Sequence, residues 1–170
     1  MQNKRFDYFV MDVDGTLTDG RIILGQDGAE YKSFYVQDGY GIANLLPVME
    51  IEPVVVTGRQ SEIVTRRCRE LGIRRCYQNV ADKKKLMDAL FADSLNRVLY
   101  MGDDLNDYDA MRYIRSGGGM IACPADAADE IKEISDYISK KKGGFGAVRD
   151  CICHIKMLYY NKIEVGGSRT

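Results

Sequence analysis

Two kinds of hydrophobic pattern alternate along this chain. Apolar runs typical of strands lie at residues 6–11, 54–56, 97–101 and 120–123, with weaker ones at 76–78 and 137–139. Segments with helical character occupy residues 42–49, 61–71, 83–91, about 105–115, 126–134 and 145–160. Strands that alternate with helices predict an α/β fold, in which a parallel sheet carries helices on both faces.

One segment departs from this alternation. Residues 21–24 and 29–36 flank the turn sequence Gly25-Gln26-Asp27-Gly28, which predicts a β-hairpin over about residues 20–36. The stretch from Asp38 to Gly41 is expected to break the second arm and to open the following helix. The hairpin and this helix fill most of the chain before Thr57. No room is left for a separate cap domain, because units below about 40 residues rarely fold alone.

Length and charge narrow the class of protein. With 170 residues and 45% apolar content, the chain can form one core, and we expect a single domain over residues 1–170 with a tail from about residue 143. Its 24 Lys and Arg nearly balance 25 Asp and Glu, which argues against nucleic-acid binding. We expect no membrane span and no signal peptide, and therefore a cytoplasmic location.

Cysteine and histidine offer little chemistry. The five cysteines are odd in number and irregularly spaced, so we expect reduced thiols rather than a disulfide framework. Cys151-Ile152-Cys153-His154 lacks the second ligand pair of a zinc site. His154 is the only histidine, so carboxylates are the main acid–base groups.

Polar residues follow three of the predicted strands. Asp12 and Asp14 leave the end of the first strand on the same side, and Gly15 lets the chain turn. By itself, this pair is also compatible with an ordinary turn. Thr57-Gly58-Arg59 and the run from Asp103 to Asp107 follow two further strands, and the carboxyl ends of parallel strands form the ligand site of such sheets.

This convergence favours phosphoryl transfer. Asp12 is the candidate nucleophile, and Asp14 the candidate general acid and base. Mg²⁺, which prefers oxygen ligands, would be held by Asp12, the main chain of Asp14 and Asp103, with Asp104 as a further candidate. Thr57 and Lys83 would bind the phosphoryl oxygens.

The motifs DVDGT, VVVTGR, VADK and GDDLND resemble, in order, the four motifs of the haloacid dehalogenase superfamily of phosphatases. The segments TDGRI, DGYGI, TGRQSEIVTRR and GGFGAVRD are similar to phosphatases of 3-deoxy-D-manno-octulosonate 8-phosphate and of nine-carbon ulosonate 9-phosphates. The resemblance implies a Rossmann-like fold without a cap domain, Mg²⁺ as cofactor, a sugar acid phosphate as substrate and a role in lipopolysaccharide biosynthesis. It also implies a homotetramer, in which hairpins associate around an axis and a neighbouring subunit covers the site.

The resemblance further implies substrate contacts. Its candidate substrate-binding residues are Thr57, Gly58, Arg59, Lys83, Asp38, Arg67 and Arg149. Arg59 favours the eight-carbon substrate, and the alternative is a surface pair with Glu62. Arg149 lies on a glycine-containing tail that would close a neighbouring site, and the alternative is a terminal helix docked on its own sheet. Asn79 departs from the family pattern, which has glycine at this position.

Two other kinds of protein share some of these features. A phosphoacceptor receiver domain also uses acidic residues, Mg²⁺, threonine and lysine, but its phosphorylated aspartate follows a middle strand of the chain. A phosphatase-like domain associated with acylneuraminate cytidylyltransferases would have lost its catalytic residues, whereas Asp12, Asp14, Lys83 and Asp103 are intact here.

Overall fold

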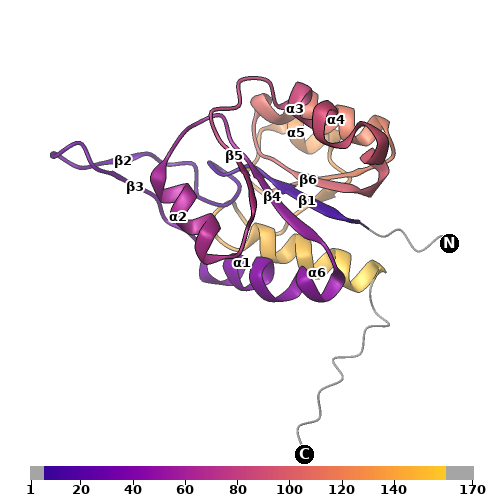
Figure 1. Ribbon diagram of the computed structural model, residues 1–170, viewed down its shortest axis with the longest axis horizontal. Coiled ribbons are helices and arrows are strands. Elements are labelled where there is room, and N and C mark those ends of the chain that lie inside the picture. Colours follow the sequence, from indigo (N-terminus) through magenta and orange to yellow (C-terminus); the bar gives the residue numbers. More distant parts are fainter. Residues whose placement is uncertain (1–5, 160–170) are drawn as a thin grey trace, which may run out of the picture.

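A central sheet lies between two layers of helices in the computed structural model, which describes residues 6–159 (Figure 1). The order of its six parallel strands is β5-β4-β1-β6-β7-β8. The strands are β1 (Tyr8–Met11), β4 (Glu52–Val56), β5 (Arg75–Tyr77), β6 (Val98–Met101), β7 (Met120–Cys123) and β8 (Tyr137–Ile138). The predicted parallel α/β sheet is confirmed.

Successive side chains of each strand point to opposite faces, so each strand contributes to two cores. Phe9 and Met11 of β1 lie in one buried cluster and Val10 lies in the other. The first cluster is covered by three α-helices, α1 (Val36–Tyr40), α2 (Glu62–Glu70) and α6 (Ala147–Tyr159). Two short helical segments, the π-helix η1 (Gly41–Leu45) and the 3-10 helix η2 (Pro47–Met49), lie on the same side. The second is covered by α3 (Lys83–Phe91), α4 (Leu105–Ser116) and α5 (Asp129–Ile134), and η3 (Ala92–Arg97) follows α3.

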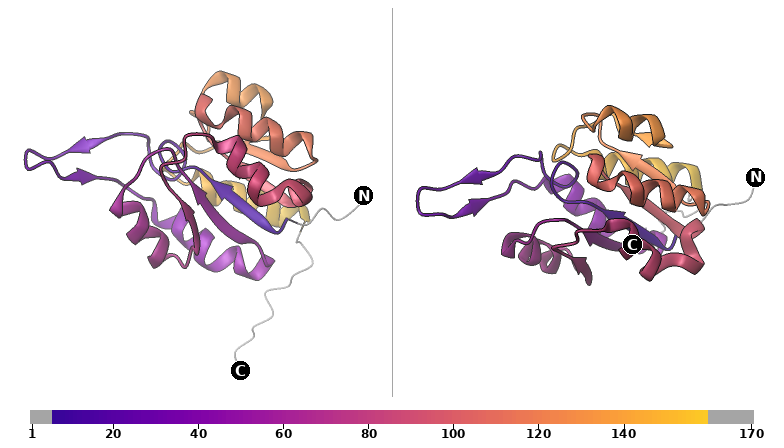
Figure 2. Two further views of the ribbon diagram at one scale, coloured as in Figure 1. Left: turned by 45° about the horizontal axis from the view of Figure 1, so that its top comes forward. Right: turned by 90° about the horizontal axis from the view of Figure 1, so that it is seen from above.

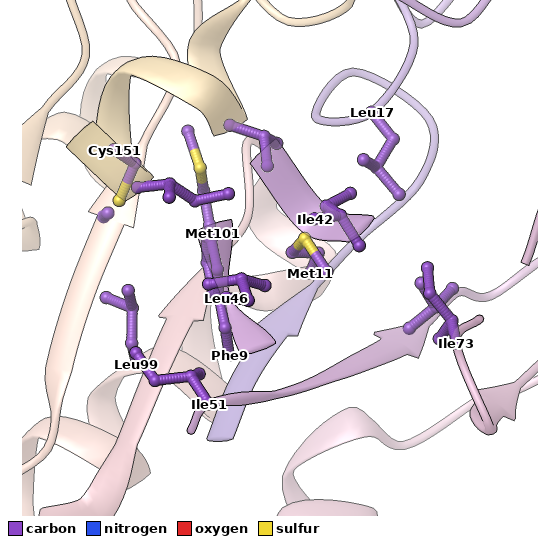
Figure 3. Close-up of a cluster of buried hydrophobic side chains, with 14 of the residues drawn as sticks. Phe9, Met11, Leu17, Ile42, Leu46, Ile51, Ile73, Leu99, Met101 and Cys151 are labelled. Atoms are coloured by element: carbon purple, nitrogen blue, oxygen red, sulfur yellow. The ribbon is translucent and has the colours of Figure 1, made fainter. Parts of the chain in front are cut away.

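The first core is shown in Figure 3. Phe9 of β1 and Leu99 of β6 pack beneath Leu46, and Cys151 of α6 lies in the same fully buried cluster. Each large apolar side chain buried in this way stabilises the fold by about 1.5–3 kcal/mol relative to an exposed one. The layer therefore fixes β1 firmly at the centre of the sheet.

The predicted hairpin is present and projects away from the sheet, on the side opposite to the first residue of β1 (Figures 1 and 2). Its strands β2 (Ile23–Leu24) and β3 (Glu30–Tyr31) pair antiparallel, and Gly28 takes a φ of +80° in the turn. The second arm is shorter than predicted, because Val36 already begins α1.

The predicted helix start at about residue 42, after a break of the hairpin arm at Asp38 and Gly39, is wrong, because the helix already begins at Val36. Both residues lie inside α1, and the helical segment continues into η1. A Cβ at Gly39 would lie 2.4 Å from an Arg67 guanidinium nitrogen, and a Cβ at Gly41 would lie 3.0 Å from Ile152. These glycines therefore allow α2 and α6 to approach the α1–η1 segment closely.

Several element boundaries follow their sequence signals. The Asp82 side chain accepts a hydrogen bond of 2.8 Å from N of Lys85, which caps α3 as predicted. Gly72, just beyond α2, has a φ of +72°. In contrast, α5 begins at Asp129 and not at Asp126, because the Asp126 carboxylate instead accepts a hydrogen bond of 2.9 Å from N of Gly143.

The glycines of the tail have close neighbours. A Cβ at Gly143 would lie 1.8 Å from O of Gly15, and N of Gly144 donates a hydrogen bond of 3.2 Å to O of Thr16. Close packing against the loop after β1 therefore explains these glycines. No helix within residues 6–159 is long and apolar enough to cross a membrane.

Candidate active site

The central strand β1 pairs with β4 on one side and with β6 on the other. Asp12, Thr57 and Asp103 follow the carboxyl ends of these three strands, directly or after one glycine. The structure thus confirms that the three polar clusters lie at one edge of the sheet, where α/β sheets bind ligands.

The loop after β1 is shaped to admit the Asp103 carboxylate. The N–H groups of Thr16, Leu17 and Thr18 all donate to O of Val13, which forms a compact turn. Gly15 has a φ of +92°, and a Cβ there would lie 1.9 Å from Oδ2 of Asp103. Any side chain at this position would displace that carboxylate, so glycine is required both by conformation and by space.

Three carboxylates share a small volume at this edge. Oxygens of Asp12, Asp103 and Asp107 lie within 4.8 Å of one another. Asp12 and Asp107 are buried, and Lys83 is buried between them, with Nζ at 3.0 Å from Asp12 Oδ1 and 2.7 Å from Asp107 Oδ1. One ammonium group cannot neutralise three carboxylates, so the cluster favours a further cation or a bound proton.

The pKa shifts reflect this excess of negative charge. Burial, followed by repulsion from Asp107, raises the pKa of Asp12 well above its usual range, although Lys83 opposes the shift. Burial and Asp107 together raise the pKa of Asp103 to about 7. Burial lowers the pKa of Lys83, but Asp107 and Asp12 outweigh it and leave the net shift upward, so this side chain stays charged.

The hydrogen bonds decide which carboxylates could hold a metal ion. Asp107 is fully engaged, since Oδ1 accepts from Lys83 and from the Tyr100 hydroxyl at 2.7 Å, and Oδ2 accepts from N of Asp103 at 3.2 Å. In contrast, Asp12 Oδ1 is buried and accepts no well-aligned hydrogen bond within the described chain, despite the nearby ammonium group. Asp12 and Asp103 therefore suit Mg²⁺, and Asp107 supports them.

Asp14 and Arg59 meet at the base of the hairpin. Asp14 forms ion pairs with Lys32 and, at 3.9 Å, with Nε of Arg59. Arg59 also reaches Glu30, with 3.2 Å between Nη2 and Oε2. The ion pairs of Arg59 in residues 6–159 are thus with Asp14 and Glu30, and the alternative pair with Glu62 is not among them.

Comparisons with known proteins agree with this geometry. No protein-family model matches the chain. The sequence is 38% identical over 159 residues to the 3-deoxy-D-manno-octulosonate 8-phosphate phosphatase KdsC of Escherichia coli K12, a match that covers 91% of this chain and 81% of that protein. The chain belongs to the family of 3-deoxy-D-manno-octulosonate 8-phosphate phosphatases.

Solved structures support the same assignment. The phosphatase of this family from Moraxella catarrhalis, in complex with magnesium ion, phosphate ion and KDO, matches with a TM-score of 0.84 and 39% identity, over 94% of this chain and 90% of that one. A putative HAD superfamily (subfamily III A) hydrolase from Legionella pneumophila matches with a TM-score of 0.83 and 31% identity, over 94% and 86%. The haloacid dehalogenase resemblance and the expected lack of a cap domain are therefore confirmed.

The sequence predicts Asp104 as a further metal ligand and gives Asp107 no role. The structure instead uses Asp104 as the N-cap of α4, where its exposed side chain accepts a hydrogen bond of 2.8 Å from N of Leu105. Asp107 follows Asp103 by four residues, one helical turn, and this spacing was the available signal.

Three predicted substrate-binding residues have their contacts away from the aspartate cluster. Asp38 is buried, and its Oδ1 accepts a hydrogen bond of 2.7 Å from N of Arg149 at the start of α6. The Arg149 side chain lies over the Tyr40 ring, at 5.2 Å from its centroid. Arg67 pairs with Glu70 at 2.8 Å. In the described chain, Asp38 and Arg149 join α1 to α6, and Arg67 pairs within α2.

The loops after β4 and β5 contact each other. Thr57 is buried at the strand end, and Gly58 is exposed beside it. Asn79 has a φ of +56°, a conformation that glycine adopts freely and that asparagine tolerates better than most residues. Asn79 lies in the loop after β5, and its N–H donates to O of Arg59 at 3.2 Å, so the two loops stay joined with asparagine in place of the family's glycine.

We expect Mg²⁺ binding to weaken as the pH falls. Because the pKa of Asp103 is raised to about 7, this carboxyl group is protonated below that pH and Mg²⁺ must displace the proton. The dissociation constant should then rise by about tenfold per pH unit below pH 7. Calorimetric titration with MgCl₂ between pH 5.5 and 8.5 measures this, and an affinity that is constant across the range would contradict it.

Proposed function

We propose that this chain hydrolyses 3-deoxy-D-manno-octulosonate 8-phosphate to the free sugar acid and inorganic phosphate, through a phosphoaspartate on Asp12. The observation that carries the proposal is the buried cluster of Asp12, Asp103 and Asp107 around Lys83, at the carboxyl ends of the central strands. The named activity of the Escherichia coli relative supports the choice of substrate.

In the first step, a carboxylate oxygen of Asp12 attacks phosphorus and forms a new P–O bond, while the bond to the sugar oxygen breaks. Asp14 donates a proton to the leaving oxygen. Lys83 offsets the negative charge of Asp12, and the Thr57 hydroxyl donates to a phosphoryl oxygen. When bound, Mg²⁺ would neutralise the phosphoryl oxygens and would be held by Asp12, Asp103 and the main chain of Asp14.

In the second step, water attacks the phosphoaspartate. Asp14 accepts a proton from this water, so the same group serves as acid and then as base. Inorganic phosphate leaves, and Asp12 is regenerated as a carboxylate. Both steps need the Asp14 carboxyl group within reach of the bond that is changing, and this makes the orientation of Asp14 critical.

A panel of substrates tests the proposal. The value of kcat/KM should be highest for 3-deoxy-D-manno-octulosonate 8-phosphate, and lower for nine-carbon ulosonate 9-phosphates and for p-nitrophenyl phosphate. Preference for a nine-carbon substrate would move the chain to the alternative specificity. Absence of turnover for every phosphate ester with Mg²⁺ present would favour a non-catalytic domain of the cytidylyltransferase-associated kind.

Arg59 is the residue we propose for recognition of the sugar acid carboxylate. Its side chain is 45% exposed beside Asp14, and a guanidinium group can bind a carboxylate through two hydrogen bonds. We expect Arg59→Ala to lower kcat/KM for the ulosonate phosphate by about 10- to 100-fold, the loss typical of a charged hydrogen bond. Because glucose 6-phosphate is an alkyl phosphate without a carboxylate, its turnover is the control. Equal loss for both substrates would contradict a role in recognition.

We also propose that the chain forms a homotetramer, in which the hairpin and the tail of one subunit complete the site of the next. The hairpin carries four exposed apolar residues that support an interface there: Ile22, Ile23, Leu24 and Tyr31. The part of the tail beyond Tyr159 lies outside the described residues.

We also propose a cytoplasmic location. The five cysteines are free thiols, which supports this location.

Subunit mixing tests whether the tail acts on a neighbour. We expect mixed tetramers of Asp12→Asn and Arg149→Ala to regain part of the activity, because each subunit type supplies what the other lacks. Exchange is verified with differently tagged chains before the assay. Full exchange without recovery would show that Arg149 acts within its own chain, as its contact with α1 allows.

A further inference from the structure

Four charged side chains form a closed ring at the base of the hairpin. Lys32 pairs with Asp14 and, at 3.2 Å between Nζ and Oε1, with Glu30. Arg59 pairs with Glu30 at 3.2 Å and approaches Asp14 at 3.9 Å. Two cations and two carboxylates thus alternate. Asp14 is the member proposed to transfer protons, and Arg59 is the member proposed to bind the sugar acid carboxylate.

Lys32 holds the most enclosed place in this ring. Its side chain has no exposed surface, whereas 21% of the Asp14 side chain and 24% of the Glu30 side chain are exposed. A pair of exposed side chains contributes little and can be lost at small cost. A lysine buried between two carboxylates is different, because its ammonium group has left water and depends on both partners.

The hairpin register places Lys32 there. Glu30 belongs to β3, and residues two apart on an extended chain point to the same side, so Glu30 and Lys32 both face the site. Tyr31 between them is 54% exposed. The contact with Lys32 and the nearby Arg59 outweigh the opposing effect of burial and leave the pKa of Glu30 below its usual value, so Glu30 stays ionised and can hold both cations.

We propose that Lys32 is a positioning residue for the reaction: its ammonium group fixes the Asp14 carboxyl group at the leaving oxygen, and Glu30 ties Lys32 to Arg59. The hairpin then contributes to catalysis in its own chain, in addition to projecting away from the sheet. This inference rests on the proposed function, since it takes Asp14 as the group that donates a proton to the leaving oxygen.

The test compares two leaving groups. A sugar alkoxide departs only with a proton, whereas p-nitrophenolate is a stable anion that needs little help. We expect Lys32→Met to lower kcat/KM for 3-deoxy-D-manno-octulosonate 8-phosphate by about 10²-fold, as a misplaced catalytic group does, and to lower it for p-nitrophenyl phosphate by less than about tenfold. Lys32→Arg should restore most of the activity toward the alkyl phosphate.

Matched controls separate positioning from folding. Lys132→Met makes the same change at a surface lysine that pairs with Asp129 at 3.2 Å, and should leave both activities unchanged. Thermal unfolding and the oligomeric state are measured for every variant. Should Lys32→Met not fold, Glu30→Gln carries the test, because it keeps the Lys32–Asp14 pair and should shift the same alkyl-to-aryl ratio by a smaller factor.

A double-mutant cycle gives the decisive result. If Lys32 acts through Asp14, adding Lys32→Met to Asp14→Asn should cost no further kcat/KM for the alkyl phosphate. A penalty of full size in the double variant would overturn the inference, and so would equal loss for alkyl and aryl substrates in Lys32→Met. Should the wild-type protein hydrolyse another alkyl phosphate, such as glucose 6-phosphate, in place of the sugar acid phosphate, the comparison remains readable. That result would overturn the proposed substrate and leave the inference about Lys32 testable, whereas absence of all turnover would overturn the proposed phosphatase function itself.

Discussion

Asp12→Asn is expected to abolish turnover while the protein remains folded. An amide nitrogen or oxygen does not replace a carboxylate as the nucleophile, so kcat should fall by about 10⁴-fold or more, as it does when a covalent nucleophile is removed from other enzymes. The substitution keeps the shape of the side chain. Because burial and Asp107 make an ionised Asp12 costly, its neutral replacement should not lower the melting temperature.

The measurement is steady-state release of phosphate with saturating Mg²⁺, together with thermal unfolding. Asp109→Asn is the matched control, since Asp109 lies on the exposed face of α4, outside the cluster, and should keep full activity. Mass spectrometry excludes conversion of the new asparagine back to aspartate. Substantial turnover in a preparation of pure Asp12→Asn would rule out the covalent mechanism.

Lys83→Met should produce the largest loss of stability. Lys83 is 3% exposed and is the cation that separates Asp12 from Asp107. Breaking a buried ion pair by removing one partner typically costs about 3–5 kcal/mol of unfolding free energy. Phosphate turnover should disappear as well, because the charge of the nucleophile is no longer offset.

The sign of the pH dependence follows from the same charges. Without Lys83, the pKa of Asp12 in the folded state rises further above its value in the unfolded chain. The loss of stability is then largest at high pH and shrinks as the pH falls and the carboxylates take up protons. Urea unfolding at pH 6 and pH 8 measures this. Lys85→Met, an exposed lysine of the same helix, is the control, and equal loss in both variants would contradict the assignment.

Local patterns were sufficient for most of the fold. The alternation of Phe9, Val10 and Met11 between two cores, the Asp82 cap of α3 and the left-handed Gly72 are each governed by a few neighbouring residues, so they are legible in the sequence. The helix start near Gly39 was predicted too late, because a glycine that breaks a hairpin arm and a helical glycine that admits Arg67 look the same until the facing helix is in place.

The residues of the candidate site also fall into two groups, those that the sequence predicts and those that only the structure reveals. The sequence by itself determined that Asp12, Thr57 and Asp103 lie at one edge, because the carboxyl ends of the strands of a parallel sheet share an edge. Only the tertiary structure decided that Asp107 supports Lys83 while Asp104 caps a helix, and that Lys32 reaches Asp14. The physical reason is that such ion pairs depend on the distance between elements that are far apart in the chain, and this distance is set by strand order, hairpin register and side-chain packing rather than by any local period.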